Sequence, residues 1–278
     1  MKIIDKKIVI KEISEAYQNI NFNMSDEIKD ALTKGLSIEK SKPGINVLNQ
    51  LLENGRIACS TKIPLCQDCG LAVIFVEHGE DARVEGGLKA AITEGVKLGY
   101  GEGYLRKSVV AGLKRVNTKD NTPPIIHIDM VPGDEITIHL GSKGGGSENM
   151  SQLKMMTPAD GVEGIKKFVD EVVTNAGPNP CPPIIIGVGI GGNFETCALL
   201  AKKALFRNIN LSNEDPEIAK LEDELLEIAN NSGVGPQGLG GVFTALGVNV
   251  ETFPCHIASF PVAVNIECHS HRHMKLTF

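Results

Sequence analysis

The sequence predicts a mixed α/β fold in which a β-sheet is flanked by helices. Short runs of β-branched residues, such as 71–76 and 184–190, alternate with longer stretches whose apolar residues recur at helical spacing. The run at 184–190 ends in glycines and leads into a helical pattern, which is typical of a strand–loop–helix unit. No linker or repeat divides the chain, so we predict one domain over 1–278 with a helical part at about 1–60.

The N-terminal part is predicted to contain three helices. Residues 10–20 place apolar side chains at helical intervals, and a second helical pattern at 27–36 follows Ser25, a residue type that caps helices. A third pattern at 45–58 comes after Lys42-Pro43-Gly44, and this combination predicts a break before the third helix.

Strands and helices alternate in the middle of the chain. The apolar run 71–76 is a predicted strand, and 86–100 has helical spacing. Two strand-like runs, 125–130 and 135–140, flank Pro132-Gly133-Asp134. Two strands separated by such a turn predict a hairpin.

The second half of the chain continues the alternation. Helical patterns occupy 161–174, 193–206 and 217–230, and Asp215 before Pro216 favours the start of the last of these. The segments 241–253 and 261–267 are predicted strands. We therefore expect the residues that carry chemistry to lie in the loops between these elements.

Composition and charge exclude several classes of protein. Apolar residues make up 42% and charged residues 22% of the chain, which is typical of a globular protein with a sizeable core. The net charge is −6 and the lysines and arginines are scattered, so the sequence does not predict nucleic-acid binding. No stretch approaches the roughly 18 apolar residues of a membrane span, and we expect a cytoplasmic protein.

The cysteines are predicted to be reduced thiols, because their number is odd and no export signal precedes them. Cys59 and Cys197 lie in helical patterns, as small hydrophobic residues do. The other five stand beside proline or glycine in loop-like segments and are candidate metal ligands: Cys66, Cys69, Cys181, Cys255 and Cys268.

Cys66 and Cys69 form a C-x-x-C pair, which by itself suits half of a zinc site or a redox pair. A redox pair usually opens a helix, whereas Gly70 and a strand-like run follow here. A structural zinc site needs a second close pair, and Cys181 stands alone. Three thiolates from distant loops, as in an iron–sulfur cluster, are the remaining interpretation.

Two glycine-rich segments resemble phosphate-binding loops without matching them. The segment 141–149 lacks the order of a nucleotide P-loop, but its backbone N–H groups suit an anion such as a carboxylate. The segment 187–194 has the wrong spacing for a dinucleotide fingerprint. Close packing of a strand against a helix explains its glycines equally well.

The whole set of motifs resembles the N-terminal part of class I fumarases, and most closely the separate α subunits of two-subunit fumarases and tartrate dehydratases. The resemblance extends from about residue 40 to the C-terminus and rests on PLCQDCG, YLRKSVV, GSKGGGSENMS, NPCPPIIIGVGIGGNFETCALLAKKAL, GLGG and PCHIASFPVAVNIECHSHRH. It implies an α/β domain in which three cysteines hold a 4Fe-4S cluster, with one iron open to a small dicarboxylate substrate.

Carried over by motif, the resemblance implies Cys66, Cys181 and Cys268 as the cluster ligands. Cys255 precedes a histidine that contacts substrate in the family, and it is not an implied ligand. Cys69 departs from the family pattern, which commonly reads QDTG at this place.

The same resemblance places five residues around the substrate: Gln67, Asp68, Arg106, Gly145 and His256. Asp68 and His256 are the implied catalytic residues, and a carboxyl group beside a ligand cysteine suits proton transfer. The planar fork of Arg106 suits a carboxylate. From the residues alone, a solvated arginine on a helix and a core histidine are the alternatives for Arg106 and His256.

The implied activity is reversible hydration of fumarate to malate, with tartrate dehydration as the first alternative. A non-catalytic iron–sulfur or zinc protein is an alternative from another class. Single-chain members of the family continue into a second domain, so the resemblance implies a separate β subunit that completes the active site. An α–α dimer is also compatible with the resemblance.

For His269, His271 and His273 we favour a solvated or subunit-contacting tail over a metal site.

Overall fold

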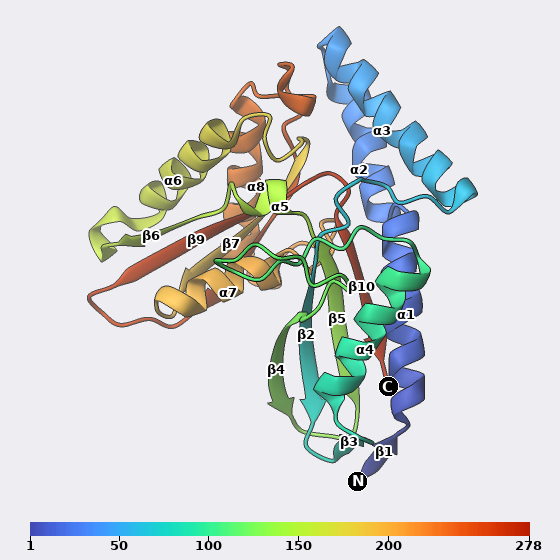
Figure 1. The fold of residues 1–278 in the computed structure, drawn as a ribbon. Helices are drawn as coiled ribbons and strands as arrows, with labels where there is room; N and C mark the ends of the chain where they lie inside the picture. The colour runs from blue at the N-terminus through green and yellow to red at the C-terminus, as the bar shows by residue number, and fades with distance from the viewer. The chain divides into compact units, whose positions relative to one another are not determined.

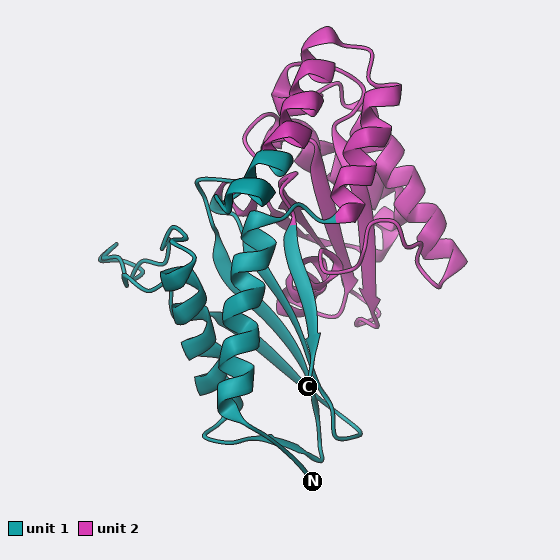
Figure 2. Ribbon diagram, turned by 90° about the vertical axis from the view of Figure 1, so that its right-hand side faces the viewer, with its two compact units in different colours: residues 1–25, 55–145, 272–278 teal, residues 26–54, 146–271 magenta.

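The computed structural model describes every residue from Met1 to Phe278 and divides them into two compact units (Figure 2). Unit 1 comprises Met1–Ser25, Gly55–Gly145 and Arg272–Phe278, and unit 2 comprises Asp26–Asn54 and Gly146–His271. Each unit contains a four-stranded sheet and helices, which confirms the predicted mixed α/β class. The single domain over 1–278 stays a prediction.

The N-terminal part contains three helices, as the sequence predicts: α1 (Lys6–Phe22), α2 (Asp26–Ile38) and α3 (Lys42–Thr61). The predicted break at Lys42-Pro43-Gly44 is wrong, because α3 begins there. Pro43 lies in the first turn, where a missing N–H removes no intrahelical hydrogen bond. The Gly44 N–H donates to Ser41 Oγ at 3.1 Å, and residues 39–41 separate α2 from α3.

The sheet of unit 1 has the order β10-β5-β2-β4, with β10 (Arg272–Thr277), β5 (Ile136–Lys143), β2 (Leu71–Gly79) and β4 (Ile125–Val131). β4 runs parallel to β2, and β5 runs antiparallel to β2 and β10. Helix α1 packs against α4 (Leu88–Glu102), and both contribute to the core that β2 and β5 share (Figure 1). A short parallel pair, β1 (Lys2–Ile4) and β3 (Ala82–Val84), completes this unit.

The predicted hairpin between 125–130 and 135–140 is wrong, because β2 lies between β4 and β5 in the sheet. The turn that follows β4 passes around the end of β2. There the N–H groups of Gly79 and Asp81 donate to the carbonyls of Glu135 and Gly133, each at 2.9 Å. β2 has the longest buried run of the sheet, and its interior position removes the apolar surface of 72–76 from water.

Close approach of two helices sets the core of unit 1. A Cβ at Gly95 of α4 would lie 2.8 Å from Ile13 Cβ, and one at Gly99 would lie 2.8 Å from the Ser14 carbonyl oxygen. The rings of Tyr17 and Tyr100 stand 5.5 Å apart between these helices. Only glycine allows the backbones of α1 and α4 to approach this closely.

The sheet of unit 2 has the order β6-β9-β7-β8, with β6 (Gln152–Met156), β9 (Phe260–Glu267), β7 (Ile184–Gly191) and β8 (Ala245–Phe253). β7 and β8 are parallel, and β9 is antiparallel to β6 and β7. Helices α6 (Gly161–Ala176) and α8 (Pro216–Asn231) share one core with the sheet, and α7 (Phe194–Ala204) packs on β7 through another (Figure 1). Unit 2 is therefore a three-layer arrangement.

The glycines of β7 serve close packing, as one interpretation of the sequence predicts. Ile186 and Val188 belong to the core under α6 and α8, whereas Gly187 and Gly189 point to α7. A Cβ at Gly187 would overlap the Ala201 carbonyl oxygen, and one at Gly189 would overlap that of Cys197. This explains the glycine pattern without a nucleotide.

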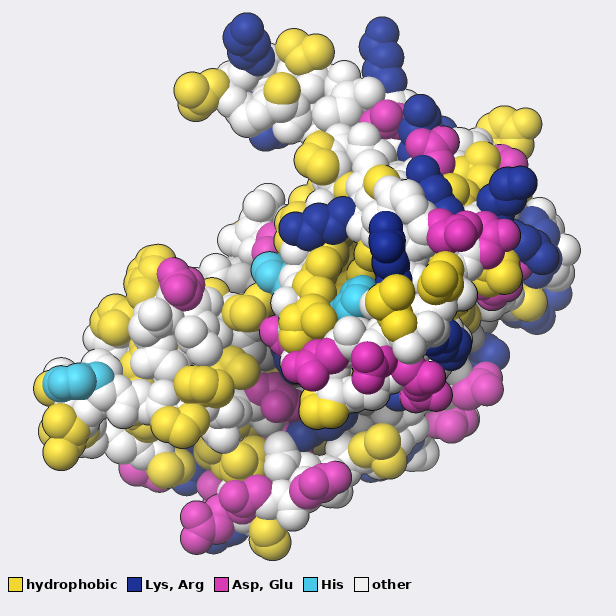
Figure 3. All heavy atoms as spheres, turned by 90° about the horizontal axis from the view of Figure 1, so that it is seen from below, with side chains coloured by type: hydrophobic (Ala, Val, Ile, Leu, Met, Phe, Trp, Pro, Cys, Tyr) yellow, Lys and Arg dark blue, Asp and Glu magenta, His cyan; other side chains and the backbone are white.

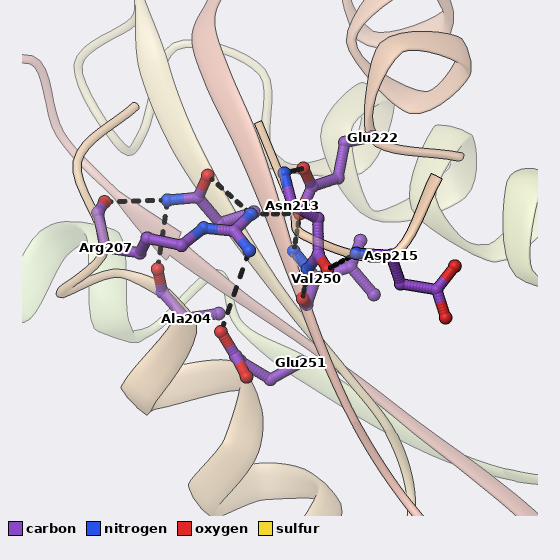
Figure 4. A network of polar contacts seen from close by, with 8 residues as sticks. Ala204, Arg207, Asn213, Asp215, Glu222, Val250 and Glu251 are labelled. Atoms are coloured by element: carbon purple, nitrogen blue, oxygen red, sulfur yellow. Dashed lines mark hydrogen bonds and ion pairs between the residues drawn. The ribbon is translucent and has the colours of Figure 1, made fainter. Parts of the chain in front are cut away.

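A polar network ties the loop between α7 and α8 to β8 (Figure 4). Glu222 is buried, pairs with Arg207, and accepts the N–H of Val250 at 2.7 Å and of Asn213 at 3.3 Å. Asn249 Nδ2 donates to the Arg207 carbonyl at 2.8 Å. One carboxylate therefore holds both the start and the end of this loop.

No helix of the chain is both long and apolar enough to cross a membrane. On the face drawn in Figure 3, the side chains of lysine and arginine are intermixed with those of aspartate and glutamate.

We predict that Glu222→Ala lowers the free energy of unfolding by about 2 to 4 kcal/mol, because Arg207 and two backbone amides lose their acceptor. The Arg207 side chain is 21% exposed, which keeps the loss below that of a fully buried pair. Urea denaturation measures the change. Glu227→Gln, at an exposed position of α8, is the control and should shift stability by less than about 0.5 kcal/mol. Equal stability of the two variants would contradict the prediction.

Candidate functional site

Two loops that carry predicted site residues lie at the same end of the unit 1 sheet. The loop 66–70 leads into β2 and the segment 143–145 follows β5, and Leu71 pairs with Lys143. The Gly145 N–H donates to Asp68 Oδ2 at 2.8 Å, and the Gly70 N–H donates to Asp68 Oδ1 at 2.9 Å. Two backbone amides therefore orient the Asp68 carboxylate.

Buried side chains support the backbone of the loop 66–70. Arg272 Nη1 donates to the Asp68 carbonyl at 2.7 Å, and Tyr100 OH donates to the Cys69 carbonyl at 2.7 Å. Asn121 Nδ2 donates to the Gly70 carbonyl at 3.1 Å. Burial raises the pKa of Tyr100, so its hydroxyl keeps the proton that it donates. Three successive carbonyls of an irregular loop are thus satisfied from the core.

The two cysteines of the C-x-x-C pair occupy different environments. Cys66 is half-buried, and its Sγ accepts the Asp68 N–H at 3.4 Å. Cys69 is 1% exposed, and its Sγ accepts the Arg106 backbone N–H at 3.2 Å. Burial raises the pKa of the Cys69 thiol, which disfavours the thiolate that a metal needs. Of the two cysteines, only Cys66 is partly exposed.

Arg106 lies beyond the end of α4 and therefore not on a helix, whereas the alternative of a solvated arginine stays open. Arg106 is exposed, and its backbone N–H donates a hydrogen bond to Cys69 Sγ. The following residues are held by Asn121 Oδ1, which accepts the N–H of Ser108 at 2.6 Å and of Val109 at 3.1 Å. The segment that carries Arg106 is therefore anchored to the loop 66–70.

Unit 2 brings the loops of Cys181 and Cys268 together at one end of its sheet. Cys181 precedes β7 and Cys268 follows β9, and Ile185 pairs with Glu267 between these strands. His269 Nδ1 lies 2.8 Å from the Cys181 carbonyl oxygen, to which it donates. Cys268 is half-buried, whereas Cys181 is exposed.

The glycine-rich segment continues into α5 (Gly145–Glu148), which lies beside the same sheet end. Ser147 Oγ donates to Glu267 Oε1 at 3.3 Å, and the Cys268 N–H donates to the same oxygen at 3.1 Å. Glu148 pairs with Lys202 of α7. The buried Glu267 carboxylate therefore joins this segment to the Cys268 loop.

His256 lies at the opposite end of the unit 2 sheet. It follows β8, whose last residue Phe253 pairs with Gly191 at the far end of β7. An eight-residue strand spans roughly 23 Å, and β7 separates this loop from Cys181 and Cys268 (Figure 1). His256 is exposed, which excludes a core histidine, and its Nδ1 accepts the Ala258 N–H at 3.1 Å. Cys255 lies in the same remote loop.

The donor set fits an iron–sulfur cluster. All seven cysteines are free of disulfides, and the three cysteines implied by the resemblance stand in loops rather than in helices. Cys66 Sγ accepts a backbone N–H, and Cys268 Sγ lies 2.9 Å from Ser270 Oγ. Such hydrogen bonds to sulfur stabilise and tune cluster thiolates.

Comparison with known proteins decides the family. A family model described as fumarate hydratase (fumerase) matches residues 10–277. The chain belongs to this family. A Methanocaldococcus jannaschii protein, named provisionally as L(+)-tartrate dehydratase subunit alpha, is 43% identical over 267 residues, 94% of each chain. L(+)-tartrate dehydratase subunit alpha of Escherichia coli is 33% identical over 288 residues, 99% of this chain and 95% of the relative. That of Shigella sonnei is 32% identical over the same length.

Membership of the fumarase family confirms the resemblance that the motifs indicate. The residues beneath the loop 66–70 were missed, because their contacts join segments 31 to 204 residues apart. The sequence marks His269 only as part of a C-terminal histidine run. The solvated tail is wrong for this segment, and a contact with another subunit stays a prediction. Ser270, His271 and Arg272 are each 4% exposed, and β10 is paired with β5.

We predict that iodoacetamide modifies the cluster-free folded chain at Cys59, Cys181 and Cys255, but not at Cys69 or Cys197. The first three are exposed, whereas burial both covers Cys69 and Cys197 and raises the pKa of each thiol. Mass spectrometry of the digested protein measures the pattern. In urea all seven cysteines should react, which controls for intrinsic reactivity. Labelling of Cys69 in the folded chain as fast as of Cys255 would contradict the core position of Cys69.

Proposed function

We propose that this chain is the α subunit of a hydro-lyase that adds water to, or eliminates it from, a four-carbon dicarboxylate at a 4Fe-4S cluster. The observation that carries the proposal is the oriented carboxylate of Asp68 beside Cys66, held by the backbone of the glycine-rich segment at Gly145. This arrangement occurs in a member of the fumarase family. It combines a metal-binding thiol, a proton-transfer group and an anion-binding loop.

The proposed cluster ligands are Cys66, Cys181 and Cys268. Three thiolates would leave one iron of a 4Fe-4S cluster open, and the bound cluster would supply Lewis acidity toward the hydroxyl group of the substrate. Cys69 is not included, because its thiol lies in the core and accepts the Arg106 N–H.

The substrate carboxylates are proposed to bind between Arg106 and the backbone at Gly145. A guanidinium offers two parallel N–H donors that match a carboxylate, and it stabilises negative charge that builds up as a C–H proton leaves. Gly145 is exposed and has no side chain, so a carboxylate can approach the backbone closely there, beside the N–H that donates to Asp68. Gln67 and Asp68 complete this set, with Asp68 in proton transfer.

L(+)-tartrate is the first candidate substrate, because relatives at 43% and 33% identity carry the name tartrate dehydratase subunit alpha. Fumarate and malate are the second candidate, because the matching family model is described as fumarate hydratase. The two reactions differ by one hydroxyl group on the substrate. Both need the same clamp for two carboxylates.

A separate β subunit is the proposed partner, since the named relatives are themselves α subunits. A covering partner would exclude water from the site, which strengthens every electrostatic interaction within it. The cytoplasm is the proposed location, where the thiols stay reduced.

His256 is proposed to act in the site of a second copy of this chain. Within its own unit, β7 separates His256 from Cys181 and Cys268 by roughly 23 Å. Its loop is exposed, and so are its apolar neighbours Phe253 and Ile257, at 57% and 89%. Exposed apolar side chains around a polar group suit an interface between subunits. In an α–α dimer, each copy would then supply His256 to the active site of the other copy.

We predict that the anaerobically reconstituted chain turns over L(+)-tartrate or fumarate only after a matching β chain is added. Arg106→Lys should keep the iron but lose about 2 to 5 kcal/mol of transition-state binding, which is tens- to thousands-fold in kcat/KM. Substrate loss and iron content measure these effects. Cys66→Ser is the control that should lose both.

Two results would contradict the proposed function. One is a colourless protein that holds one zinc ion after reconstitution. The other is an iron-loaded αβ complex that converts none of tartrate, fumarate and malate. Full activity of the α chain alone would contradict the role of the β subunit.

We predict that two inactive variants, His256→Ala and Cys268→Ser, restore activity when they are co-expressed with the β chain. A mixed dimer contains one site with an intact cluster that receives an intact His256 from the other copy. Random pairing should give about one quarter of wild-type activity, since half of the dimers are mixed and one of their two sites is complete. No recovery would contradict a His256 that acts across the dimer, as would full activity of His256→Ala alone.

A further inference from the structure

Cys181 has a backbone conformation that needs external support. Its φ angle is +57°, which lies in the left-handed region. A residue that has a side chain adopts this region only at an energetic cost. Its N–H donates to the Pro178 carbonyl at 3.0 Å, and its own carbonyl accepts from His269 Nδ1 at 2.8 Å. The contact to His269 joins it to a segment 88 residues away in the sequence.

The segment that carries His269 is itself held firmly. The Cys268 N–H donates to Glu267 Oε1 at 3.1 Å, and the Cys268 carbonyl accepts the His271 N–H at 3.2 Å. These bonds form a turn around Cys268 and hold the next residue, His269, close to it. The imidazole therefore fixes the backbone at Cys181 relative to that at Cys268.

We propose that His269 is a positioning residue that sets the distance between Cys181 and Cys268 for the cluster. This inference rests on the proposed function, which makes both cysteines cluster ligands. A carbonyl oxygen only accepts, so Nδ1 carries the proton. The hydrogen bond holds Cys181 in its left-handed conformation before iron binds, and this lowers the ordering cost of binding.

The chemistry of the side chain suggests a matched pair of variants. Asparagine carries an amide nitrogen at the place of Nδ1, two bonds from Cβ, and can donate to the same carbonyl. Leucine has nearly the same shape as asparagine but has no donor. His269→Asn should therefore keep the contact, and His269→Leu should lose it.

A remote histidine offers a control for the loss of a similar bond. His78 Nδ1 lies 2.9 Å from the Gly79 carbonyl oxygen, at the other end of the unit 1 sheet from Cys66. His78→Leu removes a histidine–carbonyl hydrogen bond without touching a cysteine loop.

The first experiment follows iron in the reconstituted αβ complex. With His269→Leu, a chelator should remove iron on the order of 10 times faster than from the wild type, because outer-shell contacts commonly change metal retention by 10- to 100-fold. The EPR signal of the cluster should also change. His269→Asn and His78→Leu should stay within about twofold of the wild type. Activity per bound cluster should be unchanged in all three, which separates positioning from substrate contact.

The second experiment needs no cluster. Amide hydrogen exchange at Asn179, Cys181 and Ile184, the residues of 179–184 that carry an N–H, should be faster in the cluster-free His269→Leu chain than in the wild type and normal in His269→Asn. If the wild-type complex binds no cluster, the proposed function fails, and this exchange measurement still decides whether His269 positions Cys181. The inference would be overturned if amide exchange were the same in the wild type and in His269→Leu. It would also be overturned if the cluster-loaded αβ complexes of these two chains lost iron at the same rate.

Discussion

The site depends on how the carbonyl groups of one short loop are satisfied. Residues 66–70 form neither helix nor strand, so their polar backbone groups find no partners within a regular element. Arg272, Tyr100 and Asn121 supply donors from three separate segments of unit 1. These donors hold the backbone of the loop, and the amides of Gly70 and Gly145 orient the Asp68 carboxylate. Such support distinguishes a prepared site from a mobile loop.

Unit 2 meets the same requirement with a different set of contacts. The glycines of β7 let α7 approach the sheet closely, and the Glu222 carboxylate ties the loop before α8 to β8. The loops at one end of this sheet can then be joined to each other by single hydrogen bonds, from His269 and from Ser147. In both units, regular elements carry the stability and irregular segments carry the candidate chemistry.

Much of the fold could be predicted from local pattern, and the errors share one cause. Helices α1, α4, α6, α7 and α8 and strands β2, β7 and β9 lie where apolar periodicity and helix caps place them. The hairpin prediction at 125–140 was wrong because a turn signal predicts a reversal of the chain but not the order of strands in the sheet. Here β2 lies between β4 and β5. The break predicted at Pro43 failed because proline is also tolerated in the first turn of a helix.

For the site, the sequence by itself determined the residue types and the family, because loop cysteines beside proline and glycine form a recognisable ordered set of motifs. Tertiary structure decided their environments. It placed Cys69 in the core and left Cys66 half-buried, although both belong to the same C-x-x-C pair. It also placed His256 at the far end of the sheet from Cys268, twelve residues later, because β9 runs the length of the sheet between them. Burial and strand direction depend on contacts between distant segments, and a linear motif does not contain them.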